Sequence, residues 1–261
     1  MIHVDHLVKK FGTVTAVDDI SFSVGAGEIF AFLGPNGAGK TTTIQMLTTL
    51  LTPTSGSITL DGLNPRDRPH DVRRRFGIVF QDPSLDNELT ASENMNLHGV
   101  LYHVPRKVRA ERIELLLKLF ELWDRRDSPV KQFSGGMRRR LEIARGLLHT
   151  PRILFLDEPT LGLDPQTRNQ LWTHVRHINE TEGVTVFLTT HYMDEADRAA
   201  HRIAIIDHGK IVAQGSSLEL RQQTGTDSLE GAFLKLTGTT IRDERGDPAE
   251  MMRQMAKMWR R

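Results

Sequence analysis

The stretch GPNGAGKTTT, Gly34 to Thr43, places three glycines and a lysine between an apolar run, IFAFL, and a helix-like segment, IQMLTTLL. Glycine packs poorly and loses much conformational freedom on folding, so this junction needs a backbone reason for it. A loop that wraps closely around a ligand, with its peptide N–H groups pointing inward, is such a reason. Gly34 is followed, after four residues, by Gly39-Lys40-Thr41, which is the spacing of a phosphate-binding loop.

The position of this phosphate loop, between a buried strand and the start of a helix, predicts that the chain binds a nucleotide. Its N–H groups and the helix N-terminus supply partial positive charge for a polyphosphate. Lys40 is expected to reach the β- and γ-phosphates, and Thr41 to offer its hydroxyl to Mg²⁺. The alternative is a strand-to-helix turn that binds nothing. The loop residues expected to contact the nucleotide are Gly34, Asn36, Gly37, Ala38, Gly39, Lys40, Thr41 and Thr42.

A second apolar strand, ILFLDEP, ends in two acids, Asp157 and Glu158. A buried strand does not carry charge without a partner. We expect Asp157 to hold the Mg²⁺ ion and Glu158 to orient and deprotonate an attacking water. The alternative is a strand end capped by solvated acids.

The segment FSGGMRRRLEIARGLL presents a second phosphate-binding pattern. Ser134 is a good N-cap, and Gly135 and Gly136 allow close approach of the backbone ahead of a helix whose positive end suits an anion. An ordinary capped helix fits this segment equally well. The arginines that follow, residues 138–140, favour a solvated helix face over a nucleic-acid patch.

Three single residues extend the predicted site. Gln81 follows the strand RRFGIVF, where it can ligate the metal, take part in catalysis and pass movement outward. His191 follows the strand VTVFLTT, where a polar tip meets the γ-phosphate, although a histidine there is often only a loop residue. Asp164 has a structural interpretation as well, because an N-cap followed by Pro165 starts a helix.

Composition limits the classes of function. The 261 residues allow one large domain or two small ones. The net charge of +1 argues against a protein that coats nucleic acid, and the absence of cysteine suits a reducing cytosol. His174 and His177 could share a helix face but lack a third ligand, so a solvated pair is expected. The charged N-terminal segment predicts no secretory signal, and no apolar run approaches the roughly 20 residues of a membrane span.

The order of the predicted elements indicates an α/β fold. Short strands fill the first third, helices the interval 82–149, and alternating strands and helices the last third, which is typical of a parallel sheet flanked by helices. A helical block therefore interrupts an α/β core. Near the C-terminus, a stripe of methionines and a tryptophan between basic residues predicts a helix that packs on its own domain or on a dimer mate, with a partner protein or anionic lipid as the alternatives. The stripe comprises Met251, Met255, Met258 and Trp259.

Taken together, GPNGAGKT, Gln81, FSGGM, ILFLDEP, LGLD and His191 resemble the ATP-binding cassette (ABC) ATPases in order and spacing, over about residues 2 to 220. The sequence from FSGGM to DPQTR, and the segment DSLEGAFLKLTG near the end, resemble the drug-exporter ATPases of the daunorubicin-resistance type. The resemblance implies a P-loop NTPase core, an N-terminal antiparallel β subdomain and an inserted α-helical subdomain at about 82–149. These parts form a nucleotide-binding domain over 1–220, followed by a C-terminal helical extension over 221–261.

The resemblance also implies a head-to-tail homodimer that encloses two ATP molecules. Each ATP lies between the phosphate loop of one copy and Ser134-Gly135-Gly136 of the other. Phe11 replaces the usual tyrosine and stacks on adenine, Asp164 crosses the interface, and His191 contacts the γ-phosphate. Met137 stands where the family usually has glutamine, whose hydrogen bonds it cannot make.

The resemblance further implies an exporter, in which this chain lies at the cytoplasmic face of the membrane, held by a separate permease. The helical block and the Gln81 link are expected to form the docking face, and no nucleic-acid partner is expected. The alternative is a soluble ABC ATPase that acts on DNA or the ribosome. A drug or antibiotic is the expected cargo, with lipid, polysaccharide or sodium as alternatives.

Overall fold

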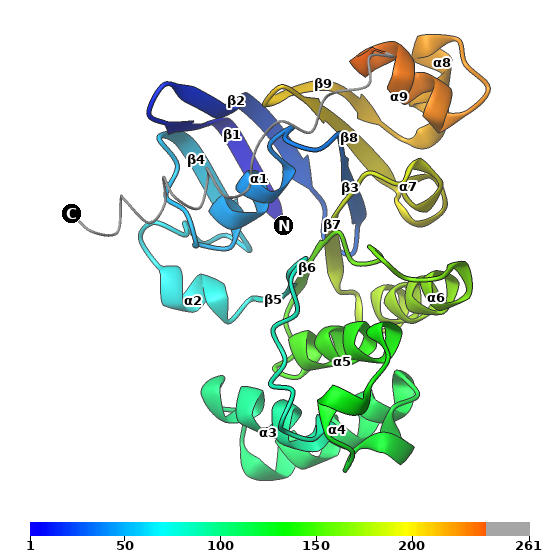
Figure 1. The fold of residues 1–261 in the computed structure, drawn as a ribbon. Helices are drawn as coiled ribbons and strands as arrows, with labels where there is room; N and C mark the ends of the chain where they lie inside the picture. The colour runs from blue at the N-terminus through cyan, green and yellow to red at the C-terminus, as the bar shows by residue number, and fades with distance from the viewer. Residues whose placement is uncertain (239–261) are drawn as a thin grey trace.

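The computed structural model describes residues 1–238, which form two sheets and a separate block of helices (Figure 1). The N-terminal sheet has the strand order β2-β1-β4, with antiparallel pairing on both sides of β1. Alternating apolar residues of these strands face inward, as in a half-buried antiparallel sheet. The strands are β1 (Ile2–Phe11), β2 (Val14–Val24) and β4 (Ser55–Leu60).

The central sheet has the order β5-β6-β7-β3-β8-β9 within the described residues, and only its edge strand β9 is antiparallel to its neighbour. β3, β6 and β7 are buried along their whole length, which agrees with the apolar runs IFAFL, ILFL and VFL at their centres. The strands are β3 (Ile29–Leu33), β5 (Phe76–Val79), β6 (Ile153–Asp157), β7 (Thr185–Thr190), β8 (Arg202–Asp207) and β9 (Lys210–Gly215).

The strand order determines where the site forms. β6, β7 and β3 are neighbours, with Asp157 in register with Thr189 and Leu33 with Thr190. The carboxyl ends of these three parallel strands therefore meet at one edge of the sheet, which is where α/β proteins bind ligands. The phosphate loop, Glu158 and His191 follow these strand ends directly.

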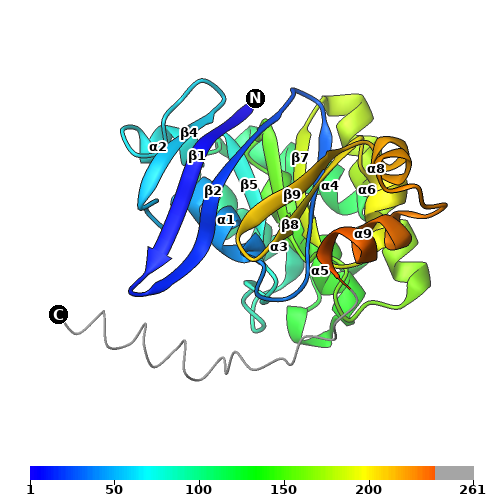
Figure 2. The same ribbon diagram turned by 90° about the horizontal axis from the view of Figure 1, so that it is seen from above.

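Two apolar layers hold the central sheet in place. On one face, Phe22 of β2 packs against Phe30, Phe32 and Phe187, with ring centroids 5.5 to 5.9 Å apart. The other face packs on helices, and in Figure 2 the N-terminal sheet and α6 lie on opposite sides of the molecule. α1 (Lys40–Leu47) and α2 (Pro69–Arg73) pack on the same side as Phe22, whereas α6 (Pro165–Glu182) and α7 (Met193–Ala199) cover the other face.

The helical block leaves the sheet after β5 and returns to it before β6 (Figure 1). Its first helix begins at a capping box, in which Thr90 and Glu93 satisfy each other's backbone N–H groups. The block contains α3 (Ala91–Leu101), α4 (Arg106–Leu119) and α5 (Gly135–Leu147), with 3₁₀ turns η1 (Trp123–Arg125) and η2 (Val130–Gln132). These elements fall inside the predicted interval 82–149, and the fold is the α/β class expected.

Two further helices follow the central sheet, α8 (Ser217–Thr224) and α9 (Leu229–Thr237), and they pack against each other. Among residues 1–238, none of the helices combines the length and the apolar character needed to cross a membrane. The helix predicted from the methionine stripe lies outside the described residues. The domain division at residue 220 stays a prediction.

Candidate nucleotide-binding site

The glycines of the phosphate loop are required by close packing. A Cβ atom on Gly34 would lie 2.5 Å from the carbonyl oxygen of Ile206, and one on Gly39 would lie 2.6 Å from that of Ala16. Gly39 also has a φ of +107°, a backbone conformation that residues other than glycine rarely adopt. The loop therefore passes directly over the neighbouring strands, and substitution at either position would displace it.

The loop leads into α1, whose N-cap is Gly39 and which no side chain within residues 1–238 caps. The first-turn N–H groups are thus available to an anion. Lys40 is buried, and its Nζ donates to the carbonyl oxygens of Gly34 at 2.8 Å and Pro35 at 3.2 Å, which fixes it across the loop. Asn36, Gly37 and Thr41 are exposed, Thr42 is half-buried and Ala38 is buried. This cradle fits a polyphosphate.

Glu158 contacts two other predicted residues, Lys40 and His191. Its carboxylate lies 3.2 Å from Lys40 Nζ and 2.6 Å from His191 Nδ1, although Glu158 is only 6% exposed. Its backbone has a φ of +49°, in the left-handed region that is unfavourable for glutamate. The structure thus brings the phosphate loop, the second acid of ILFLDEP and His191 into one cluster at the sheet edge.

Asp157, next to Glu158, offers the oxygen ligands that Mg²⁺ prefers. Burial raises the pKa of Asp157, while hydrogen bonds from the Thr189 and Thr41 hydroxyls act in the opposite direction. A carboxylate beside a hydroxyl fits a magnesium ion that takes its remaining ligands from water and phosphate. Among residues 1–238 there is no group of three or more His, Cys, Asp or Glu side chains that could hold a metal ion.

Gln81 lies at the start of the link to the helical block, with its side chain exposed. Its carbonyl oxygen accepts a hydrogen bond of 3.1 Å from Arg139, which also donates to the carbonyl of Phe80 at 2.6 Å. Arg139 is 7% exposed and pairs with Glu142 at 3.1 Å. The expectation of a solvated face for residues 138–140 is therefore wrong for Arg139. Successive helix residues point about 100° apart, so one of three arginines must face the link.

The second predicted phosphate segment begins α5. Ser134 caps this helix as expected, accepting from the N–H of Met137 at 3.2 Å. A Cβ on Gly136 would lie 2.4 Å from a methyl carbon of Thr167, which shows how closely α5 approaches the first turn of α6. Asp164 caps α6 through the N–H of Thr167 at 3.0 Å. Thr167 thus contacts both Gly136 and Asp164, and no pattern in the sequence predicts this connection.

Some predicted residues lie apart from the cluster. Within residues 1–238, no hydrogen bond or ion pair connects Ser134, Asp164 or Phe11 with Lys40 or Glu158. Phe11 ends β1, where the Lys9 ammonium lies 5.0 Å from its ring centroid. In Figure 1, α1 lies near the N-terminal sheet, whereas α5, which begins after Ser134, lies in the helical block. One copy of the chain therefore carries two separate groups of predicted residues.

These features define a P-loop nucleotide-binding core with an inserted helical block. Residues 17–161 match the ABC transporter family, and the chain belongs to this family of ATPases. It is 46% identical to the daunorubicin/doxorubicin resistance ATP-binding protein DrrA of Streptomyces peucetius, over 87% of this chain and 69% of that one. It is 42% identical to the Nod factor export ATP-binding protein I of Ralstonia nicotianae, over 88% and 72%.

A solved structure supports the fold and the chemistry. The dimeric post-hydrolysis state of the ATP-binding cassette MJ0796, bound to ADP and Pi, superimposes with a TM-score of 0.75 at 29% identity. The match covers 83% of this chain and 98% of that one. The predicted family, fold class and ATPase activity are confirmed. The roles of the individual site residues stay predictions.

Proposed function

We propose that this chain powers an exporter by hydrolysing Mg²⁺-bound ATP, as a homodimer held at the cytoplasmic face of the membrane by a separate permease. The observation that carries the proposal is the buried cluster in which Glu158 contacts both Lys40 of the phosphate loop and His191. Relatives named for drug resistance and for Nod factor export favour an antibiotic-like or lipid-like cargo.

The chemistry follows from the positions of these side chains. Lys40 and the α1 N-terminus bind the β- and γ-phosphates, and Glu158 accepts a proton from the water that attacks the γ-phosphorus. His191 donates to Glu158 or to the γ-phosphate and keeps the carboxylate oriented. Asp157, Thr41 and Gln81 would hold Mg²⁺, which when bound would supply positive charge against the charge that develops on the phosphates. The products are ADP and inorganic phosphate.

A second copy supplies the groups that one chain leaves apart. Ser134, Gly135 and Asp164 are exposed, and so are Asn36 and Thr41 on the phosphate loop. In a head-to-tail homodimer, the uncapped α1 of one copy faces the α5 N-terminus of the other, and both direct partial positive charge at the same ATP. The dimeric state named for the MJ0796 structure supports this arrangement.

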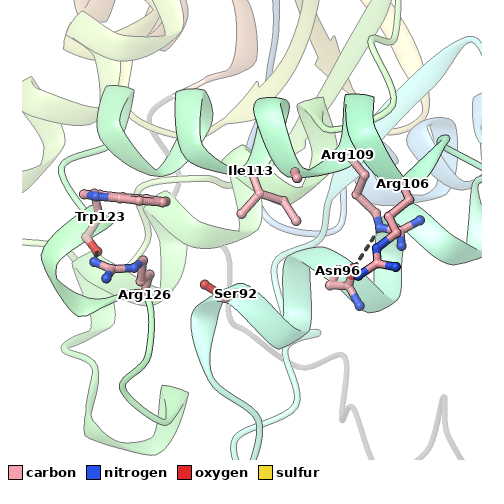
Figure 3. A pocket seen from close by; sticks show the side chains of 8 residues that line it. Ser92, Asn96, Arg106, Arg109, Ile113, Trp123 and Arg126 are labelled. Atoms are coloured by element: carbon pink, nitrogen blue, oxygen red, sulfur yellow. Dashed lines mark hydrogen bonds between the residues drawn. The ribbon is translucent and has the colours of Figure 1, made fainter.

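The helical block offers a docking surface for the permease. A cavity of about 350 Å³ opens between α3 and α4 (Figure 3). Arg106 and Arg109 line one end, and Arg126 stacks on Trp123 at the other, with 4.5 Å between guanidinium and ring centroid. Ile113 lies between the two ends (Figure 3). Three arginines around an apolar floor complement a cytoplasmic segment of the permease that carries acidic and apolar side chains.

The test is drug retention in cells that express this chain together with a candidate six-span permease, measured by daunorubicin fluorescence. We expect the pair to lower retention, and the permease with the Lys40→Ala chain to behave like the permease alone. Arg106→Glu should release the ATPase from permease-containing membranes while its ATPase activity in solution is preserved. Sedimentation of the chain with ribosomes or DNA, and no permease-dependent efflux, would favour the soluble ABC ATPase instead.

A further inference from the structure

Thr189 is a buried hydroxyl shared by the two acids of the site. It lies near the end of β7 and is 0% exposed. Its Oγ1 donates to Asp157 Oδ1 at 2.5 Å and accepts from the backbone N–H of Glu158 at 3.1 Å. The same N–H also points at the carbonyl oxygen of Thr189, 3.2 Å away.

The direction of these bonds is fixed by chemistry. A hydroxyl has one proton, and because the Glu158 amide can only donate, that proton must go to Asp157. A carboxyl oxygen accepts that proton, so the bond fixes one orientation of the Asp157 oxygens. The other bond holds the Glu158 backbone at its unfavourable φ of +49°, which directs the side chain towards Lys40 and His191.

Comparison with the rest of β7 indicates that packing does not require a hydroxyl at Thr189. Val186, Phe187 and Leu188 are buried and apolar, and valine has nearly the shape of threonine. Thr185, at the other end of the same strand, is also fully buried, but its hydroxyl accepts from the backbone N–H of Gly27 and lies away from the acids. Thr189 differs from it in that its two hydrogen bonds reach Asp157 and Glu158.

We propose that Thr189 is a positioning residue for ATP hydrolysis, which sets the metal-binding carboxylate and the water-activating glutamate relative to each other. This inference rests on the metal and water roles proposed above for Asp157 and Glu158. Hydrogen bonds to metal-ligating carboxylates orient them, and their loss commonly weakens metal binding by about 10- to 100-fold. Thr189 therefore affects the metal and the base together, without touching ATP.

The experiment compares Thr189→Val with Thr189→Ser and uses Thr185→Val as the matched control. Mn²⁺ binding in the presence of a non-hydrolysable ATP analogue is followed by electron paramagnetic resonance, beside the Mg²⁺ dependence of ATPase activity and the melting temperature. We expect Thr189→Val to raise the half-saturating Mn²⁺ concentration by about 10-fold or more. Thr189→Ser should restore most of the affinity, and Thr185→Val should change only the melting temperature.

Asp157→Asn separates this inference from the proposed site. If Asp157→Asn loses Mn²⁺ binding while Thr189→Val retains it, Thr189 has no positioning role and the site stands. If Asp157→Asn binds Mn²⁺ normally, the metal site is wrong and the role of Thr189 falls with it. Equal losses in Thr189→Val and Thr185→Val also overturn the inference, because both then report general destabilisation. Thr189→Ala provides a second hydroxyl-free variant if valine prevents folding.

Discussion

The ion pair between Lys40 and Glu158 makes a specific prediction about ATP affinity. Both side chains are buried, 6% and 7% exposed, with 3.2 Å between Nζ and Oε1. The γ-phosphate is proposed to bind the same ammonium group. ATP binding therefore replaces Glu158 by the γ-phosphate as the anionic partner of Lys40. The free energy of the lost Lys40–Glu158 ion pair makes ATP binding weaker by that amount.

Glu158→Gln tests this exchange because it keeps the size of the side chain and removes its charge. The glutamine amide still accepts from the Lys40 ammonium, so only the charge–charge part of the contact is lost, about 1 kcal/mol within the 1.5–3 kcal/mol range of hydrogen bonds to charged groups. When ATP binds, the variant therefore loses roughly 1 kcal/mol less interaction free energy at Lys40 than the unchanged protein does. This difference corresponds to about fivefold tighter ATP binding. Hydrolysis should fall by about 10²- to 10⁴-fold, because the general base is lost.

The assay is titration calorimetry of ATP in a Ser134→Arg background, where the proposed sandwich cannot form and affinity reports one loop alone. Phosphate release is measured in parallel without the Ser134 change. Glu195→Gln is the control, since Glu195 is a buried acid of the same region that is hydrogen-bonded to Thr160 rather than to Lys40. Weaker ATP binding by Glu158→Gln, or near-normal turnover, would refute the reasoning; near-normal turnover would point to His191 as the base.

Three further predictions follow from other parts of the molecule. Ser134→Arg and Lys40→Ala chains, each inactive alone, should recover partial ATPase activity when mixed, because a mixed dimer keeps one complete site; no recovery with proven heterodimers contradicts a shared site. Burial lowers the pKa of His98 to about 3 and of His149 to about 4. Below pH 6.5 the unfolded chain therefore binds more protons than the folded one. As the pH decreases, the free energy of unfolding should fall by up to about 1.4 kcal/mol per pH unit for each histidine. Urea titrations between pH 7 and 5 check this, and His98→Phe should flatten the dependence. Arg139→Gln should slow hydrolysis while ATP binding at the phosphate loop survives, because the Gln81 backbone loses its anchor; unchanged turnover argues against that link.

The parts of the site that could be predicted from the sequence are those determined by residues that are consecutive in the chain. The phosphate loop, the N-caps at Ser134 and Asp164, and the acids after an apolar strand each depend on a few consecutive side chains. Local backbone chemistry requires particular residue types there, such as glycine at Gly39, where φ is positive. Such requirements can be recognised before any long-range contact is known.

Contacts between strands could not be predicted in the same way. Thr189 meets Asp157 because β6 and β7 are neighbours in register, and nothing in VTVFLTT distinguishes its hydroxyl from that of Thr190. Arg139 looks like its neighbours along the chain, and only the approach of the Phe80–Gln81 link buries it. The signal available for Thr189 was its position one residue before the end of an apolar strand, in a chain whose other apolar strand ends in two acids.

The pattern of exposure separates what one chain completes from what it leaves open. Asp157, Glu158 and Lys40 are buried and satisfied by partners within the same copy. Asn36, Gly37 and Thr41 of the phosphate loop, by contrast, face solvent, as do Ser134, Gly135 and Asp164. Burial of the first set fixes the acids before ATP arrives, whereas the exposed residues gain partners only when a nucleotide and a second surface cover them. In the proposed homodimer, hydrolysis would depend on assembly, because the groups proposed to contact the phosphates would be divided between two copies, while the proposed base and metal ligand are already positioned in each.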